Sequence, residues 1–159
     1  MTLRPLVPGD EPALEALAEA TGAFTEEELA VAAELIALGH DDDPDEYLFV
    51  VAEEGGEPAG FACFGRAPLS DGAWDLYWIV VGPAYQRRGI GGELLAAAES
   101  SAAAYGARLM LVETASKPSY EGARRFYTGH GYEEVGRVPD LYAVGDDKVL
   151  NAKRLLASA

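Results

Sequence analysis

Apolar residues recur along this chain with two different periods, and each period predicts a different kind of element. Leu14, Leu17 and Ala18 are three and four residues apart, which indicates one face of a helix. Residues 73–81 are instead rich in aromatic and β-branched side chains, which is typical of a strand. In chain order the pattern predicts a strand at 2–7, a helix after Asp10, a helix from Thr25 to about Leu38, strands at 47–54, 59–67 and 73–81, a helix from Ile90 to about Tyr105, a strand at 108–114, a helix at 118–131, and strands at 132–138 and 148–155.

Short polar residues stand at the expected starts of the first two helices. Asp10 is placed to cap the first helix, because its side chain can accept from the unpaired N–H groups of the first turn. Thr25 and Glu28 have the spacing of a capping box at the start of the second helix. "GDDK" at residues 145–148 is expected to form the turn between the last two strands.

The order of these elements predicts an α/β domain built around one sheet with helices on both faces. Strict alternation along residues 73–81 divides this strand between the two faces. Asp75, Tyr77, Ile79 and Val81 are expected on one face, and Trp74, Leu76, Trp78 and Val80 on the other. The 159 residues suit one domain with its own core, so a single domain over residues 1–159 is expected.

The composition narrows the class of protein. An apolar fraction of 49% fits a globular chain, and no stretch approaches the length of a membrane span, so we expect a cytoplasmic protein with no membrane partner. The single cysteine, Cys63, lies in an apolar stretch and is interpreted as a buried thiol rather than a nucleophile. His40 and His130 are far apart and belong to no Cys/His cluster, so we predict no metal.

The charge is strongly asymmetric along the chain. The formal net charge is −15, and residues 1–80 carry 18 acidic and two basic residues, whereas residues 81–159 carry nine acidic and ten basic ones. A basic face for nucleic acid is absent from this pattern, so no nucleic-acid partner is predicted. The asymmetry suggests an anionic ligand on the second half and a cationic one drawn to the first.

The stretch "AYQRRGIGG" at residues 84–92 follows a predicted strand and opens a predicted helix. Glycines allow the backbone to approach a ligand closely, and the N–H groups of a helix start favour anions. Arg87 and Arg88 add planar donors suited to phosphate, so the stretch predicts a pyrophosphate site. Neither a Walker loop nor a dinucleotide fingerprint fits, because Gly92 is followed by Glu93 and Leu94 and a third glycine at the required spacing is missing.

These residues resemble the acetyl-CoA-binding motif of the GCN5-related N-acetyltransferases, Q/R-x-x-G-x-G/A. Gln86 to Gly91 match the motif position by position, and "ARRFYTGHGY" at residues 123–132 resembles the next helix of the family. The resemblance extends over nearly the whole chain. It implies a mixed, mostly antiparallel central sheet of about seven strands flanked by four helices and split between the fourth and fifth strands.

The resemblance also implies how acetyl-CoA would be held. The backbone of Ile79, Val80 and Val81 is expected to bond the pantetheine arm, and a main-chain N–H at a bulge, that of Ile79, to polarise the thioester carbonyl. The pyrophosphate is expected at the N–H groups of the loop and helix start. These residues are Arg87, Arg88, Gly89, Ile90, Gly91 and Gly92, preceded by Gln86.

Two residues are candidates for proton transfer. Asp75 falls where histone-type members of the family carry a glutamate base, and its shorter side chain would act through a water molecule; a paired structural carboxylate remains the alternative. Tyr127 matches the family tyrosine that points at the coenzyme sulfur, although a core tyrosine would have the same pattern. Tyr120 stands where many members have an asparagine that contacts the cofactor. In this chain the contact is either lost or replaced by Ser116 or Ser119.

The acceptor is expected to be a small-molecule or peptide amine, and cationic, because the acidic first half is where the family builds its acceptor site. Tyr77, Glu113 and Thr114 are candidates to line this site, and a cap on the next turn is the alternative role for Glu113 and Thr114. The resemblance implies that a homodimer is an option for this chain. Two alternatives remain open: a non-catalytic acyl-CoA sensor of the same fold and an unrelated nucleotide-binding domain.

Overall fold

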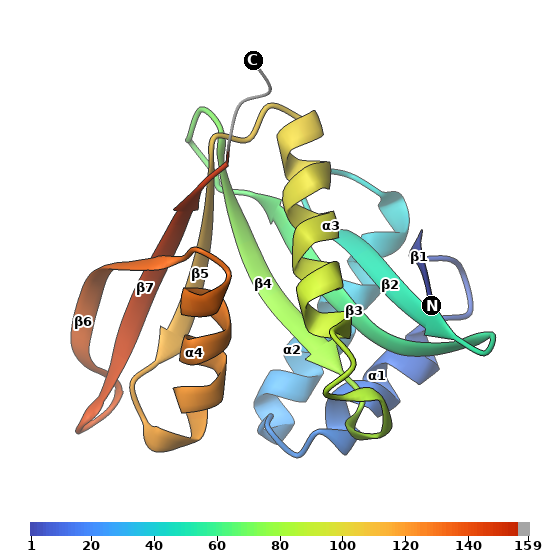
Figure 1. The fold of residues 1–159 in the computed structure, drawn as a ribbon, viewed down its shortest axis with the longest axis horizontal. Coiled ribbons are helices and arrows are strands. Elements are labelled where there is room, and N and C mark those ends of the chain that lie inside the picture. The colour runs from blue at the N-terminus through green and yellow to red at the C-terminus, as the bar shows by residue number, and fades with distance from the viewer. Residues whose placement is uncertain (156–159) are drawn as a thin grey trace.

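A computed structural model describes residues 1–155 of the chain and shows one seven-stranded sheet with helices on both faces (Figure 1). The strands are ordered β1-β2-β3-β4-β5-β7-β6. Only the β4–β5 pair is parallel among the described pairs, so the mixed, mostly antiparallel sheet is confirmed. The bounds of the strands are β1 Thr2–Pro5, β2 Leu48–Glu54, β3 Glu57–Arg66, β4 Ala73–Val81, β5 Leu109–Ala115, β6 Glu133–Ala143 and β7 Asp146–Arg154.

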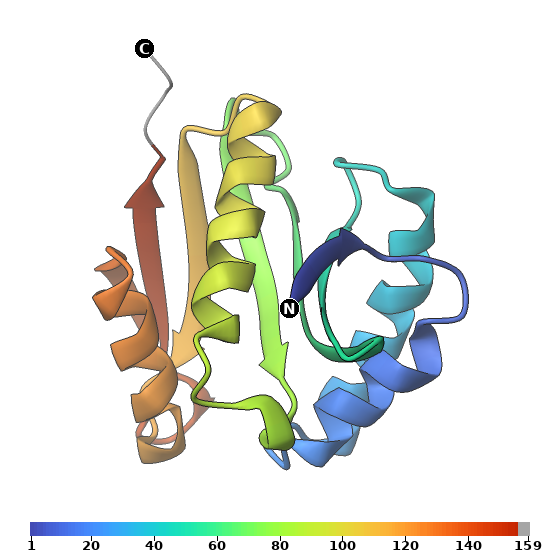
Figure 2. The same cartoon turned by 45° about the vertical axis from the view of Figure 1, so that its right-hand side comes forward.

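Four α-helices lie within residues 1–155, as expected, and they form two layers (Figure 2). Helices α3 and α4 cover one face of the sheet, and α1 and α2 cover part of the other. Their bounds are α1 Glu11–Ala20, α2 Glu26–Leu38, α3 Ile90–Ala104 and α4 Glu121–Gly129.

Local sequence explains the helix starts only in part. The capping box predicted for α2 is present, with Thr25 and Glu28 each accepting from the other's backbone N–H. The predicted cap of α1 is wrong, because the Asp10 carboxylate makes no cap hydrogen bond. It instead receives two hydrogen bonds from Arg4, at 2.7 and 2.9 Å. A charged partner on β1 thus outcompetes the weaker bonds of the helix start.

The C-terminal elements begin and end at different residues from those predicted. The segment Pro118–Tyr120 forms a 3₁₀ turn, and α4 begins after it at Glu121 rather than at Pro118 as predicted. The turn between β6 and β7 lies at residues 144 and 145, so Asp146, Asp147 and Lys148 belong to β7 and not to a turn as predicted. Register shifts in β6 absorb the extra residues of this long hairpin.

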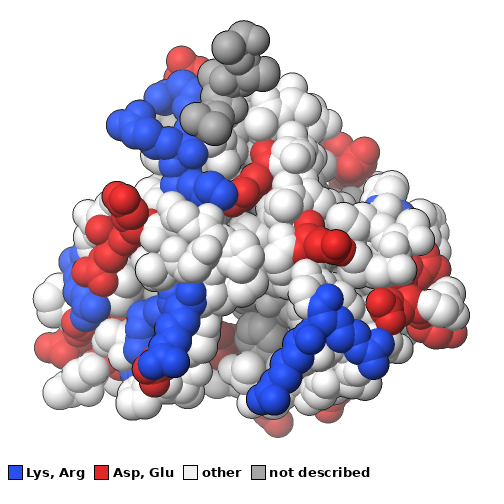
Figure 3. Space-filling model, in the orientation of Figure 1, with Lys and Arg blue, Asp and Glu red and all other residues white. Residues whose placement is uncertain are grey.

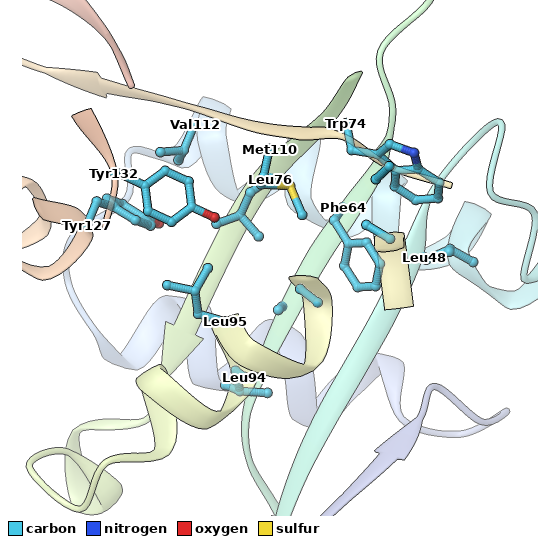
Figure 4. Close-up of a cluster of buried hydrophobic side chains, with 14 of the residues drawn as sticks. Leu48, Phe64, Trp74, Leu76, Leu94, Leu95, Met110, Val112, Tyr127 and Tyr132 are labelled. Carbon is cyan, nitrogen blue, oxygen red and sulfur yellow. The ribbon is translucent and has the colours of Figure 1, made fainter. Parts of the chain in front are cut away.

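Two cores hold the layers together. The larger core packs the buried faces of α3 and α4 against the sheet and includes Leu94, Leu95 and Tyr127 (Figure 4). The smaller core packs α1 and α2 against β2 and β3 through residues such as Leu14, Ile36 and Phe61. Each fully buried leucine stabilises the fold by about 1.5–3 kcal/mol, so both layers are fixed on the sheet.

Candidate functional site

The parallel pairing of β4 with β5 ends halfway along β4. Residues Ala73 to Leu76 pair with Leu109 to Val112, and beyond this point the two strands separate (Figure 1). The β5-facing edge of β4 from Tyr77 to Val81 therefore has no strand partner in the described structure. Backbone N–H and C=O groups on such an edge are available to the amides of a ligand. The split predicted between the fourth and fifth strands is confirmed.

A β-bulge lies at the same point on the other edge of β4. Cys63 of β3 pairs with Trp78 and Phe64 pairs with Leu76, so Tyr77 is an extra residue on β4. The bulge and the end of the β5 pairing coincide within one residue. A bulge re-aims the backbone groups that follow it, which is the feature expected of an N–H that polarises a carbonyl.

The bulge also corrects the predicted faces of β4. Ile79 and Val81 pack into the core under α3 and α4, together with Trp74 and Leu76, whereas Tyr77 packs into the opposite core under α1 and α2. Strict alternation is therefore wrong beyond Tyr77. One inserted residue moves every following side chain to the other face, because the side-chain period of a strand is two. Asp75 stays on the face opposite Leu76 and shares it with Tyr77.

The loop before α3 has a conformation suited to an anion. Arg87 and Gly89 both have left-handed backbones, with φ of 64° and 78°, on either side of Arg88. Helix α3 begins directly after Gly89 at Ile90. The first backbone bond into this helix joins the N–H of Glu93 to the carbonyl of Gly89, and among the described residues no acceptor is found for the N–H groups of residues 87–92. This is a row of free donors at a helix start.

Gly91 and Gly92 are held close to α4. A Cβ built on Gly91 would lie 3.4 Å from the Phe126 ring, and one on Gly92 would lie 3.0 Å from Nε2 of His130. The Nδ1 atom of His130 is 2.7 Å from the carbonyl oxygen of Phe126, which fixes the orientation of the imidazole. The two glycines thus also serve the packing of α3 on α4, a reason that the sequence pattern did not reveal.

Basic side chains flank this helix start on two sides. Figure 3 shows one group over the loop before α3 and another over α4, with a recessed surface between them. Arg88 is 55% exposed and lies 3.1 Å from Glu54, and Arg125 on α4 is 79% exposed and lies 2.9 Å from Glu121. Gln86 donates to the carbonyl of Val81 at 3.1 Å, which ties the loop to the end of β4. The recess therefore suits a polyphosphate ligand.

The Asp75 carboxyl is half-buried on β4, and burial is the first cause that raises its pKa. The negative charge of Glu113 raises this pKa further, and the positive charge of Lys148 opposes the rise. Glu113 and Lys148 form an ion pair of 2.9 Å between Oε1 and Nζ. Asp75 therefore has a charged neighbourhood and a pKa moved toward neutrality, as a general base requires.

Aromatic residues from several elements surround these charges. Tyr47 and Tyr77 meet edge to face with 5.3 Å between ring centroids. Burial raises the pKa of Tyr120, and the charges of Glu28 and Asp146 contribute to the rise. We call this group the acceptor-side cluster. It comprises Glu28, Tyr47, Asp75, Tyr77, Glu113, Tyr120, Tyr142 and Lys148, which act on one another electrostatically or by contact.

The predicted proton donor lies on the other face of the sheet. Tyr127 is 8% exposed in the core under α3 and α4, and its ring meets those of Phe126 and Tyr132 edge to face (Figure 4). Burial raises the pKa of its hydroxyl. None of the side-chain hydrogen bonds found within residues 1–155 involves this hydroxyl, whereas Tyr132 beside it donates to Glu99 at 2.7 Å. No fully buried side-chain nitrogen or oxygen there lacks a partner, so the hydroxyl keeps some contact with solvent. Asp75 and Tyr127 thus lie on opposite faces of the split sheet.

Other candidates have structural roles. Thr114 is buried and lies 3.4 Å from Nδ2 of Asn151, so it does not face the acceptor-side cluster. The Ser116 hydroxyl accepts from the N–H of Asp147 at 2.7 Å, which engages it within the fold. Cys63 is fully buried, and burial raises the pKa of its thiol, as expected of a core residue.

Sequence reasoning did not select Lys148 or Tyr142 for the site. Both come from the β6–β7 hairpin, more than sixty positions after Asp75 in the chain. Lys148 stood in a stretch that was interpreted as a turn. The only signal was the polar "GDDK" itself, and no local pattern could show that it lies beside β5.

Within residues 1–155 no group of three or more His, Cys, Asp or Glu side chains is arranged to hold a metal ion. None of the described helices has the length and apolar character needed to cross a membrane.

Comparison with known proteins agrees with this geometry. The model of the acetyltransferase (GNAT) family matches residues 13–132. The chain belongs to the GNAT acetyltransferases. A crystal structure from Desulfovibrio desulfuricans, described as an acetyltransferase of this family, shares 34% sequence identity and a TM-score of 0.92, over 98% of this chain and 99% of that one. No curated protein sequence matches this chain.

Solved structures with lower sequence identity share the fold. An aminoglycoside 6'-N-acetyltransferase in complex with coenzyme A has 18% identity and a TM-score of 0.77, with 98% of each chain covered. The ribosomal-protein-S18-alanine N-acetyltransferase of Escherichia coli has 22% identity and a TM-score of 0.77, over 99% of this chain and 96% of that one. A third, yncA from Salmonella typhimurium, was solved with acetyl-CoA and has 20% identity and a TM-score of 0.77, over 100% of this chain and 96% of that one.

This GNAT acetyltransferase has residues that fit acetyl-CoA as its co-substrate. The free edge of β4 offers main-chain partners to an extended amide chain, and the N–H groups of residues 87–92 offer donors to a pyrophosphate. Gly89, Gly91 and Gly92 leave the backbone of the helix start without side chains. These features lie along one line from the split to the start of α3 (Figure 1).

Proposed function

We propose that the chain transfers an acetyl group directly from acetyl-CoA to the amine of a cationic acceptor, with both substrates bound at once. The observation that carries this proposal is the coincidence of the bulge and the strand split at Tyr77. At this point a ligand on one face of the sheet can reach a ligand on the other face through the gap between β4 and β5. The acceptor-side cluster lies on one face, and the basic recess with Tyr127 lies on the other.

Acetyl-CoA supplies an acetyl thioester, and the chain binds and orients it. Ile79, Val80 and Val81 are proposed to hold the pantetheine amides through the backbone edge that β5 leaves free. The N–H groups of the loop and the start of α3, with Arg87 and Arg88, are proposed to hold the pyrophosphate. The N–H of Ile79, just after the bulge, is proposed to polarise the thioester carbonyl.

Asp75 is proposed to take the proton from the acceptor ammonium, directly or through a water molecule. A neutral amine is required for attack, and a carboxylate with a raised pKa is a better base than an exposed one. Tyr127 is proposed to donate to the departing sulfur. Its raised pKa keeps the hydroxyl protonated, so it can donate a hydrogen bond to the thiolate as the carbon–sulfur bond breaks. Tyr77 and Glu113 are proposed to contact the acceptor.

A screen of amine acceptors with thiol detection tests the proposal. The protein is incubated with acetyl-CoA and a panel of monoamines, diamines, amino sugars and amino-terminal peptides, and free coenzyme A is measured. We expect thiol release that depends on the amine and is highest with cationic acceptors.

Tyr127→Phe should reduce the rate by about 100-fold with little change in stability, because the ring keeps its packing against Phe126 and Tyr132.

Calorimetric titration with coenzyme A completes the test. Tight binding of coenzyme A with no thiol release from any amine would contradict catalysis and favour a non-catalytic acyl-CoA sensor. Affinity for ATP or NAD without affinity for coenzyme A would overturn the cofactor assignment. Equal rates with neutral and cationic amines would remove the charge preference and leave the acetyltransferase.

A further inference from the structure

The ion pair between Lys148 and Glu113 occupies the acceptor-side cluster without an evident structural need. Lys148 is 27% exposed and Glu113 is 53% exposed, so the pair faces solvent. Glu113 stands on β5 opposite Leu150, and Lys148 stands on β7 opposite Ala115, which makes them diagonal neighbours on one sheet face. An exposed pair of this kind contributes about 0–1 kcal/mol, so the fold does not depend on it.

The ammonium group of Lys148 has the same neighbours that the proposed acceptor ammonium would have. Its strongest contact is the hydrogen bond to Glu113, which raises the pKa of the lysine, and the charges of Tyr142 and Asp75 raise it further. The side chain is therefore a fixed cation among the acids and aromatic rings of the cluster. A primary ammonium is the same chemical group as the proposed substrate.

The position of Glu113 relative to Asp75 sets the spacing of two cationic sites. Asp75 is in register with Leu111 on the parallel neighbour, so Glu113 stands two residues beyond it. Ideal strand geometry places the Cα atoms of Asp75 and Glu113 about 8 Å apart at the point where the strands separate. An acceptor with two amines joined by four or five carbons can place one at each carboxylate.

We propose that Glu113 binds a second cationic group of the acceptor and that Lys148 is a tethered competitor, which this group must displace. Lys148 is in this sense a specificity-determining residue. It occupies the carboxylate that a second ammonium would bind, so it lowers the affinity for a diamine more than the affinity for a monoamine. The inference rests on the proposed function only for the site at which the acceptor binds.

Calorimetry without turnover tests the competition. Binding of 1,4-diaminobutane and of butylamine is measured in the presence of saturating free coenzyme A, which holds no acetyl group to transfer. Lys148→Gln should strengthen binding of 1,4-diaminobutane about two- to fivefold, the range that an exposed ion pair allows. Glu113→Gln should weaken the same binding by a similar factor, and butylamine should respond less to both changes.

Matched variants separate this effect from net charge. Lys148→Arg keeps the cation and should bind the diamine as the wild type does. Arg66→Gln removes one positive charge from the ion pair with Asp45, outside the cluster, and should leave diamine binding unchanged. In the Glu113→Gln background, Lys148→Gln should bring no gain, because the two residues act as a pair.

The outcomes are decisive for the inference. Unchanged or weaker diamine binding by Lys148→Gln overturns it, and so does equal strengthening by Arg66→Gln or an absence of diamine binding to both wild type and Lys148→Gln. Failure of the proposed function looks different: the calorimetric changes would appear as predicted, but no amine would release thiol from acetyl-CoA.

Discussion

At the scale of single residues, Asp75 shows how position gives a common side chain its candidate role. Its carboxyl is half-buried beside the strand split, and burial and Glu113 both raise its pKa. Lys148 partly offsets the rise. Asp71, four positions earlier in the chain, is exposed and lies outside this cluster. The candidate role of Asp75 thus depends on desolvation and on the sign of nearby charges.

Replacing Asp75 should change the pH dependence of the reaction. A base must be deprotonated, so activity should rise with pH through the raised pKa of Asp75. Asp75→Asn should lower kcat about 100-fold and remove this acid limb, whereas Glu113→Gln should move the limb to lower pH, because a negative charge that raises the pKa is gone. Profiles of kcat/KM against pH check both expectations.

Asp71→Asn is the control for this experiment, since it removes an exposed carboxylate only four positions earlier in the sequence. It should leave the profile unchanged. A wild-type profile for Asp75→Asn would take Asp75 out of the mechanism.

At the scale of elements, the start of α3 is defined by backbone conformation more than by side chains. Gly89 has a φ of 78°, and a Cβ there would meet no atom within 4 Å. Space is therefore open at this position, and the cost of a side chain comes from the left-handed backbone alone. In the proposed complex this open space is where the pyrophosphate lies.

Gly89→Ala should therefore weaken cofactor binding as well as stability. We expect a loss of stability of about 1 kcal/mol from the left-handed conformation, and a rise of about tenfold in KM for acetyl-CoA from the methyl group at the anion site. Steady-state kinetics and thermal unfolding measure the two effects.

Gly106 provides a matched control at the other end of α3. It has a φ of 91° and also has no atom within 4 Å of a built Cβ. Gly106→Ala should cost similar stability and leave KM for acetyl-CoA unchanged. Equal KM values for the two variants would contradict the assignment of the pyrophosphate to the loop.

At the scale of the whole molecule, charge is divided between the two halves of the chain. The first 80 residues carry 18 acidic and two basic residues, and most of the cations lie in the second half. The fold places basic side chains around the recess beside α3, and it places the acids Glu28, Asp75 and Glu113 together on the acceptor side. The two proposed substrates have opposite charges, and each meets the complementary region.

This separation predicts a salt effect that depends on the charge of the acceptor. Raising the salt from about 0.01 M to about 0.15 M shortens the Debye length from about 30 Å to about 8 Å. For a diamine we expect kcat/KM to fall several-fold while kcat stays constant. For an aromatic amine, which is uncharged at neutral pH, kcat/KM should be nearly insensitive. The same salt dependence of kcat/KM for both amines would show that electrostatic steering does not bring the acceptor to the site.

The sequence by itself determined most helices and strands and the family, and it predicted the cofactor loop. Helix periodicity, the capping box at Thr25, and the run from Gln86 to Gly92 are local signals, because the residues that cooperate there are neighbours in the chain. The candidate base and tyrosine also came from the family resemblance, which is read position by position.

Only the tertiary structure decided how the site is assembled. The bulge at Tyr77 reversed the expected facing of Ile79 and Val81, and nothing in an apolar strand of this composition marks where a bulge falls. Lys148 reached Glu113 only because β7 lies beside β5. Strand pairing joins residues that are distant in the chain, so the contacts that tune charge and pKa cannot be found from local sequence patterns.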